Sequence, residues 1–332
     1  AFVNKSINYE KNPPQSNFAK RMLISGEQLW NTWDGRSDAD WRGERMWTDY
    51  IQPYWSGTHS RFYDTNTDFG GAGYDLSPTN LSAQLNSGWN YYFIATHGGT
   101  SIWAMESGGY YYSSHAQSLT NSDRQGIVVT IACLSNRFDG ETAVSEGFIR
   151  NGGGGAVAYH GSSRYGWGYS SQSSSLGPSY KLSAYFFKHL FTGQPSSDSY
   201  KFGSVATLAK LEYINYCTSY NTQRWLTFAL NHIGDPELDL LTDDPSVMTA
   251  SHSGTLSVGT QSVYIDNINA SEAAASFYCD GVFYGKTVIS GGSGILSLDA
   301  PVPENVSSSI LTITAHNYKP YISEITIEDN QP

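Results

Sequence analysis

Two side chains that can cooperate in covalent catalysis, His97 and Cys133, each follow a short apolar run in the sequence. The runs Tyr91–Thr96 and Ile127–Ala132 are rich in aromatic and β-branched residues, which is typical of fully buried strands. If the two strands are adjacent and parallel, an imidazole and a thiol lie at the carboxyl edge of one sheet, where open α/β sheets bind ligands. The pair predicts the chemistry of a cysteine peptidase.

An imidazole beside a thiol increases the reactivity of the thiol as a nucleophile. A free thiol has a pKa of about 8.5 and is only a few per cent thiolate at neutral pH. A neighbouring imidazole stabilises the thiolate and can later protonate the leaving amine. The backbone N–H groups of Gly98 and Cys133 are candidates for an oxyanion hole. A lone cysteine after an apolar strand is more often a buried hydrophobe, but the His97–Gly99 motif after a comparable strand favours catalysis.

The composition narrows the class of protein. The 332 residues are enough for one large domain and a small one, and 39% of them are hydrophobic. Charged residues make up only 15%, and 24 tyrosines and many Ser, Gly, Asn and Thr residues take their place, which favours a secreted protein. The net charge of −11 argues against a nucleic-acid partner. No apolar run approaches the roughly 18 residues of a membrane helix.

The ends of the chain and its cysteines carry two further expectations. Residue Ala1 is not an initiator and no signal peptide follows it, so we expect a processed or truncated product. Three cysteines cannot all pair with one another. Because Cys217 lies in a helical stretch and Cys279 in a separate tail, we expect no disulfide framework.

Residues 1–244 alternate between strand and helix patterns. Strands are expected at 22–25, 61–63, 91–96, 127–132 and 156–160. Helices are expected at about 1–10, 37–50, 78–85, 142–150, 178–191, 203–216 and 223–231. The glycine- and tyrosine-rich stretch 101–121 is expected to form a loop or hairpin near the site. This alternation predicts an α/β fold with a mostly parallel sheet between two helical layers.

Residues 245–332 differ in composition from the rest. After Asp243–Pro245 the helical periodicity disappears, and short strands are expected at 262–265, 275–278, 310–314 and 322–327. A length of about 87 residues predicts a small all-β sandwich of immunoglobulin type.

The order of several short motifs resembles the gingipain-type cysteine peptidases, peptidase family C25. The motifs are Asn8–Asn12, Thr96–Gly99 with Trp103, Ile131–Asn136, Gly147–Arg150, Gly155–Ala158, Gly234–Leu238, and in the tail Tyr278–Gly285 and Thr312–Tyr318. Each motif is short, but together they cover nearly the whole chain. The resemblance implies a caspase-like catalytic domain over residues 1–244 and an immunoglobulin-like domain over 245–332.

The resemblance also assigns roles to residues. The family's general acid/base histidine falls on His97 and its nucleophile on Cys133. The acidic residue that orients this histidine falls on Glu27, because both follow the first core strand. In the arginine-specific members an aspartate at a helix start lines the primary specificity pocket.

Two positions are implied for that pocket in this chain. The helix start carries Asp40, with Asp38 close by, and the tryptophan that shapes the pocket falls on Trp167. The aspartates also suit capping of a helix N-terminus, and the tryptophan also suits plain loop packing.

Two departures from the family pattern stand out. The family has an N-terminal subdomain before the Tyr9–Glu10 motif, and this chain starts almost at that motif. The family often has a residue other than glycine at the position of Gly99, so the loop after His97 is expected to be looser here.

Other candidate groups carry weaker signals. Histidines 115, 160 and 232 lack zinc-ligand spacing, and His160 is either structural or lines the cleft. The run Gly152–Gly155 follows a helix and precedes a strand, the reverse of a phosphate loop, so nucleotide binding is rejected. The loop Asp64–Asp68 supplies oxygen ligands suited to a structural calcium ion, although such runs are more often plain turns.

The sequence thus predicts a secreted, monomeric cysteine endopeptidase that cleaves after Arg or Lys and needs no cofactor for its chemistry. Cys133 would attack the peptide carbonyl, and His97 would move the proton. The alternative from another class is a non-catalytic secreted adhesin or binding protein that keeps the fold. A third reading is an acyl-transferring or self-processing enzyme that uses the same pair.

Overall fold

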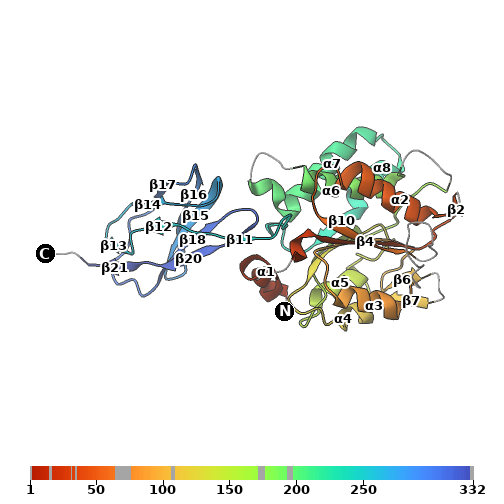
Figure 1. Cartoon of the computed structure of the whole chain (residues 1–332), viewed down its shortest axis with the longest axis horizontal. Coiled ribbons are helices and arrows are strands. Elements are labelled where there is room, and N and C mark those ends of the chain that lie inside the picture. Colours follow the sequence, from red (N-terminus) through yellow and green to blue (C-terminus); the bar gives the residue numbers. More distant parts are fainter. Residues whose placement is uncertain are drawn as a thin grey trace. The chain divides into compact units, whose positions relative to one another are not determined.

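The chain divides into two compact units, residues 1–244 and 245–332 (Figure 1). The computed structural model describes residues 2–14, 17–30, 32–33, 36–63, 76–105, 109–170, 176–192 and 197–329. No helix among these residues is long and apolar enough to cross a bilayer.

Within the described residues, the first unit is built on a six-stranded sheet with the order β10-β9-β8-β5-β1-β4. The strands from β4 to β9 pair in parallel, and β10 pairs antiparallel to β9 at one edge. The strands are β1 Arg21–Gly26, β4 Thr58–Tyr63, β5 Tyr91–Ala95, β8 Gly126–Thr130, β9 Ala156–Ser162 and β10 Leu230–Ile233. All residues of β5, β8 and β9 are buried, as their apolar sequences predict.

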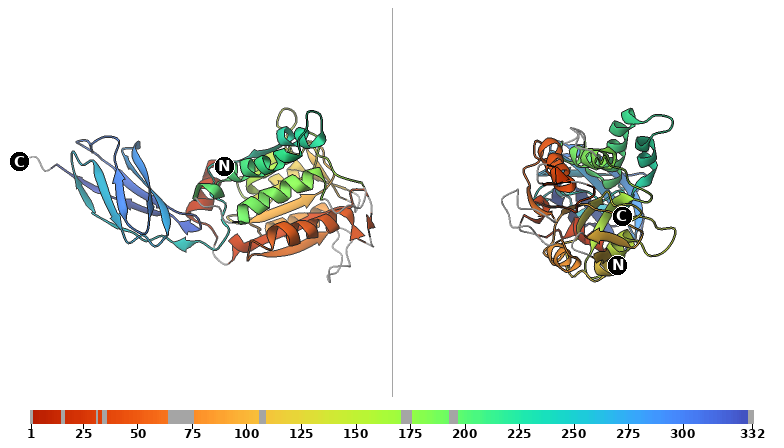
Figure 2. Two further views of the ribbon diagram at one scale, coloured as in Figure 1. Left: turned by 90° about the horizontal axis from the view of Figure 1, so that it is seen from above. Right: turned by 90° about the vertical axis from the view of Figure 1, so that its right-hand side faces the viewer.

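Helices cover both faces of this sheet (Figure 1). The helices are α1 Phe2–Lys11, α2 Asp38–Met46, α3 Pro78–Asn86, α4 Ser113–Gln117, α5 Val144–Arg150, α6 Pro178–Phe191, α7 Phe202–Tyr213 and α8 Thr222–Ala229. One face carries α2, α6, α7 and α8, of which α2 and α6 lie side by side (Figure 2). The other face carries α3, α4 and α5. A π-helical turn, Trp47–Ile51, continues α2.

The two-residue period of the strands divides the core between these faces. On β5, Tyr91 and Phe93 belong to the cluster under α6 and α7, which contains Phe187. Tyr92 and Ile94 belong to the cluster under α3 and α5. Both faces of the central strands are therefore covered, and polar side chains are left to gather at the strand ends.

Most expected elements of the first unit are confirmed, with one error and two additions. The expectation of helix through residue 231 is wrong, because α8 ends at Ala229 and Leu230–Ile233 forms β10 on the edge of β9. Pairing of residues 230–233 with the distant strand β9 outweighs their weak local preference for helix. The stretch 101–121 contains the hairpin of β6, Ile102–Met105, and β7, Gly109–Tyr112, and also the unexpected α4. Residues 32–33 and 36–37 form a second short hairpin, β2–β3.

The second unit is all-β over the described residues. Its larger sheet has the order β16-β15-β18-β20 and its smaller one β12-β14-β17, both antiparallel. Their strands are β12 Ser251–His252, β14 Ser262–Asp266, β15 Glu272–Cys279, β16 Val282–Ser290, β17 Gly294–Ser297, β18 Ser309–Thr314 and β20 Tyr321–Glu324. Short parallel pairs join β11 Ser246–Val247 to β19 Tyr318–Lys319 and β13 Thr255–Ser257 to β21 Thr326–Glu328.

The second unit has its own hydrophobic core. Alternate residues of β15, including Phe277, are buried in it, as expected for a strand with one face exposed. The single strand expected at 322–327 is two strands, β20 and β21, which belong to different sheets. The immunoglobulin-type topology of this unit stays a prediction.

Candidate active site

The parallel pairing of β5 with β8 brings the ends of these two strands to the same edge of the sheet. Ile94 lies opposite Thr130 in the register. His97 follows β5 by two residues and is exposed, and Cys133 follows β8 by three and is half-buried. The two candidate catalytic side chains therefore leave neighbouring strands at one edge.

Gly98 lies directly against the backbone of Cys133. A Cβ atom at Gly98 would lie 2.7 Å from the Cys133 carbonyl oxygen and 2.9 Å from the Ala132 Cβ. Only a residue without a side chain allows the chain to pass this closely. Glycine here is thus required by the meeting of the two strand ends.

The hairpin β6–β7 holds the other side of this segment. The Gly99 N–H donates to the Ile102 carbonyl at 3.0 Å, and the Ala104 N–H donates to the His97 carbonyl at 2.8 Å. Between these bonds, Gly98 faces Trp103 as a non-hydrogen-bonded antiparallel pair, so its N–H points away from β6.

A backbone carbonyl fixes the imidazole of His97. Nε2 lies 2.9 Å from the Leu29 carbonyl oxygen. Because a carbonyl can only accept, Nε2 carries the hydrogen in this contact, and the neutral ring keeps Nδ1 as its basic nitrogen. The Trp30 ring meets the imidazole edge-on, with 6.0 Å between the ring centres.

Glu27 acts on His97 through the main chain. Its side chain is buried, and Oε1 accepts hydrogen bonds from the His97 N–H at 2.6 Å and the Thr96 hydroxyl at 2.7 Å. These two bonds to the Glu27 carboxyl group fix where the chain that carries His97 leaves β5. Orientation of the imidazole itself by this carboxylate stays a prediction.

The thiol of Cys133 lies against the backbone of Gly166, in the loop after β9. The Gly166 N–H donates to Sγ at 3.2 Å, and Sγ lies 3.9 Å from the Gly166 carbonyl oxygen. Burial raises the pKa of the Cys133 thiol, and the Gly166 N–H and the cysteine's own N–H oppose that rise. Leu134, the next residue, has φ +59°, a strained conformation for a non-glycine residue at a functional position.

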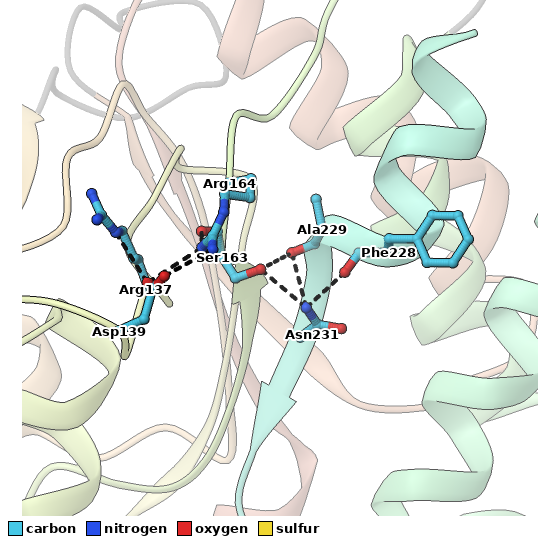
Figure 3. Close-up of polar contacts among 7 residues, drawn as sticks. All are labelled: Arg137, Asp139, Ser163, Arg164, Phe228, Ala229 and Asn231. Carbon is cyan, nitrogen blue, oxygen red and sulfur yellow. Dashed lines mark hydrogen bonds and ion pairs between the residues drawn. The ribbon is translucent and has the colours of Figure 1, made fainter. Parts of the chain in front are cut away.

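Polar contacts tie the loop after β9 to the loop after β8, which carries this cysteine (Figure 3). The Leu134 N–H donates to the Arg164 carbonyl at 3.0 Å. The Asp139 carboxylate pairs with Arg164 at 2.9 Å and with Arg137 at 3.0 Å. These exposed pairs contribute little stability each, but they fix the loop after β9 beside the loop that carries the thiol.

The same loop is tied to the start of β10. The Asn231 side chain donates to the Ser163 hydroxyl at 3.0 Å and to the Phe228 carbonyl at 2.8 Å (Figure 3). The Trp225 indole N–H donates to the Tyr165 carbonyl at 3.0 Å. Edge strand β10, which sequence reasoning missed, therefore supports the loop that contacts the thiol.

The two aspartates at the start of α2 are both fully buried. The hydroxyl of Ser37 caps the helix by accepting from the Asp40 N–H at 3.1 Å. Asp38 instead accepts hydrogen bonds from the Leu29 N–H at 2.9 Å and forms an ion pair with Arg42 at 3.2 Å. The structure thus separates the two: Asp38 holds the segment after β1, and Asp40 stays the candidate for the pocket.

Trp167 lies in the loop after β9 and is 46% exposed. Its backbone is held by Ser179, whose hydroxyl accepts from the Trp167 N–H at 2.8 Å. The next residue, Gly168, packs on Trp30, since a Cβ there would lie 2.3 Å from the indole ring. The backbone contacts leave the Trp167 ring at the surface near the thiol loop.

Residues 1–241 match the family model of peptidase family C25. The chain belongs to this family. It is therefore a cysteine peptidase, and its substrates are proteins or peptides.

The fold of this C25 peptidase also matches solved structures. A complex of the Porphyromonas gingivalis RgpB pro- and mature domains is 18% identical, with 98% of this chain and 73% of that chain covered at a TM-score of 0.77. The Arg-specific cysteine proteinase gingipain R is 18% identical, with 98% and 72% covered at a TM-score of 0.81. Among curated proteins no sequence matches. The likeness confirms a caspase-like fold followed by a β domain.

Three contributors to the site of this C25 peptidase were missed from the sequence: Leu29, Gly166 and Arg42. The first two act through backbone atoms that every residue has, so their types carry no signal. Arg42 lies four residues after Asp38, a spacing that suits a helical ion pair and offered a weak signal.

The remaining sequence candidates lie elsewhere or are structural. His160 is buried and stacks on Phe186 at 4.9 Å, and burial lowers its pKa. The loop Asp64–Asp68 lies outside the described residues, so calcium binding there stays a prediction. Among the described residues no group of three or more His, Cys, Asp or Glu side chains is placed to hold a metal ion. All three cysteines are free.

Alkylation should distinguish Cys133 from the other two cysteines. Burial raises the pKa of all three thiols, so burial alone lowers the thiolate fraction of each cysteine at neutral pH. An imidazolium at His97 would reverse this for Cys133 alone. We expect iodoacetamide at pH 7 to modify Cys133 at least about tenfold faster than Cys217 or Cys279.

The same experiment has an internal control. In His97→Ala, the Cys133 rate should fall to that of the other thiols and recover only at alkaline pH. Mass spectrometry of peptides across pH 6–10 measures all three rates at once. Equal rates for the three thiols in the unmodified protein would contradict activation of Cys133.

Proposed function

We propose that this C25 peptidase is a secreted cysteine endopeptidase that uses a Cys133–His97 dyad. The observation that carries the proposal is the meeting of the two strand ends, where Gly98 passes against the Cys133 carbonyl. The thiol and the imidazole supply the chemistry, so no cofactor is needed. We further propose that the protein acts as a monomer, outside the cell or at its surface.

The proposed reaction proceeds through a thioester. His97 takes the Cys133 proton, and the thiolate forms a bond to the substrate carbonyl carbon. The resulting oxyanion is stabilised by the N–H groups of Gly98 and Cys133. Support comes from the Gly98 N–H, which points away from β6. The C–N bond then breaks as the imidazolium protonates the leaving amine, and a water molecule activated by His97 hydrolyses the thioester.

We propose that cleavage follows Arg or Lys. Tyr180 lies within electrostatic reach of three carboxylates, Glu27, Asp38 and Asp40, and of one cation, Arg42. The formal charge of these four groups is −2 (three negative, one positive), which favours a cationic side chain at this end of the sheet. Trp167 offers an exposed aromatic face in the neighbouring loop. The gingipain R structure with the same fold is that of an Arg-specific proteinase.

A peptide panel tests this preference. Fluorogenic peptides with Arg, Lys, Gln or Leu on the acyl side of the cut should be turned over only for Arg and Lys. Asp40→Asn should lower kcat/KM for the Arg peptide by about 100-fold, because a desolvated charge pair with substrate is lost. Asp49→Asn, at an exposed ion pair just beyond α2, is the matched control and should leave kcat/KM unchanged.

The outcomes separate mechanism from specificity. Turnover of Leu or Gln peptides would support the Cys133–His97 mechanism but would contradict the role of Asp40 in specificity. Failure to cleave any peptide or denatured protein would favour a binding protein that keeps the fold.

A further inference from the structure

We propose that Asp38 and Arg42 form a buried positioning pair that sets the catalytic histidine through a single peptide group. This inference rests on the proposed role of His97. Both side chains are fully buried, and Arg42 Nη1 lies 3.2 Å from Asp38 Oδ2. The hydrogen bonds that the pair makes to the rest of the chain involve backbone atoms of residues 29, 30 and 169, so its effect on the reaction passes through those segments.

The connection to His97 runs through the backbone of residues 29 and 30. Asp38 Oδ1 accepts from the Leu29 N–H at 2.9 Å and from the Trp30 N–H at 3.4 Å. The Trp30 N–H and the Leu29 carbonyl belong to the same planar peptide group. The Leu29 carbonyl oxygen is the atom that contacts His97 Nε2 at 2.9 Å.

A carboxylate at one end of this peptide group strengthens the bond at the other end. Hydrogen bonds in a chain polarise one another, so an anion on the N–H makes the carbonyl a better acceptor. The carbonyl then holds Nε2–H more firmly and favours the imidazolium that forms when the thiol loses its proton. Asp38 thereby supports the tautomer in which Nδ1 is the base.

The other end of the pair reaches the substrate side of the site. Arg42 Nη2 donates to the Tyr169 carbonyl, in the loop that also carries Gly166 and Trp167. The Trp30 ring contacts Gly168 of the same loop and the His97 ring. The Asp38–Arg42 pair thus holds both the peptide group that contacts His97 and the loop whose Gly166 N–H donates to the thiol.

Substitution of the carboxylate by its neutral isostere isolates this role. Asp38→Asn keeps the size of the side chain and one acceptor oxygen. In one orientation its amide N–H₂ group faces Arg42, and in the other the Leu29 N–H loses its acceptor. We expect kcat on the best peptide to fall about 10- to 100-fold, because a misplaced catalytic group costs up to this much. KM should change less than threefold. The rate of Cys133 alkylation at pH 7 should fall in parallel.

Two variants separate positioning from mere stability. Glu44→Gln breaks the ion pair between the buried Glu44 and the partly exposed Arg61, away from Leu29, and should lower stability while kcat stays within twofold. Arg42→Lys keeps a cation beside Asp38 but loses the planar fork. Because the Tyr169 carbonyl loses its donor, kcat should fall about three- to tenfold with an unchanged KM, and this variant serves as the test if Asp38→Asn does not fold: an unchanged kcat would overturn the inference.

The inference and the function it rests on fail in different ways. If the unmodified protein cleaves peptides and Asp38→Asn has its normal kcat, the inference is overturned and the function stands. A loss of kcat in Glu44→Gln as large as that in Asp38→Asn would also overturn it. If no peptide is cleaved, the function fails, and an unchanged alkylation rate in Asp38→Asn still overturns the inference.

Discussion

Replacement of Cys133 by alanine is expected to lower kcat on the best peptide by a factor on the order of 10⁴ or more, since the covalent intermediate can no longer form. KM should change by less than about threefold, because binding contacts to substrate do not depend on the sulfur atom. Steady-state and single-turnover assays with the same fluorogenic peptide measure both quantities. The substitution removes one atom from a half-buried position, so the fold should persist.

The other two cysteines supply matched controls. Cys217→Ala removes a half-buried thiol in the first unit, and Cys279→Ala removes a buried one in the second. Both should keep full peptidase activity. Residual activity above about 1% in Cys133→Ala, after contaminating protease is excluded, would assign the nucleophile to another residue.

Substitution of Glu44 by glutamine is expected to lower the free energy of unfolding by roughly 3 kcal/mol at pH 7. Glu44 is buried and accepts from both ends of the Arg61 guanidinium at 2.8 and 2.9 Å and from the Tyr63 hydroxyl at 2.9 Å. Burial alone would raise the pKa of this carboxyl, but the nearby His59 and the hydrogen bonds from Arg61 and Tyr63 together lower it to about 2, from 4.5.

The pH dependence of this loss has a definite sign. Because the folded pKa lies below the unfolded value, the unfolded state binds more protons between about pH 2 and 4.5. The contribution of Glu44 is complete above pH 4.5 and is lost as the pH falls through about 2. The difference between the two proteins should therefore shrink steadily from pH 5 to pH 2.

Urea unfolding of both proteins at several pH values measures this difference. Asp49→Asn, which removes a half-exposed partner of Arg45, is the control and should cost less than about 0.5 kcal/mol. A constant difference between the Glu44 variant and its parent at all pH values would show that the carboxylate does not titrate as described.

Glu44 stabilises the C-terminal half of helix α2, away from Leu29 and His97. It anchors α2 to Arg61 and Tyr63 of β4, and the N-terminal turn of the same helix carries Asp38 and Asp40. The partly exposed Glu44–Arg61 pair holds the C-terminal half of the helix, and the buried Asp38–Arg42 pair separately holds its start.

The sequence by itself determined which edge of the sheet carries the candidate catalytic residues of this C25 peptidase. Apolar runs as dense as Tyr91–Thr96 and Ile127–Ala132 can only be buried strands, and the alternation with helices makes neighbouring strands parallel. Residues that follow such strands must gather at one edge. The positions of His97 and Cys133 were therefore predictable. Division into an α/β part and an all-β part followed from the change in periodicity after residue 244.

Tertiary structure alone decided how that edge is held together. The Leu29 carbonyl fixes the imidazole and the Gly166 N–H contacts the thiol, yet any residue type offers these groups. Strand β10 forms only because the edge of β9 is available, so local preference could not show it. Asp38 and Asp40 look alike in sequence, and only packing turns the first toward Leu29 and Arg42. Contacts between distant backbone atoms leave no mark on residue type, and for this reason the sequence could suggest the candidate reacting groups but not the contacts that support them.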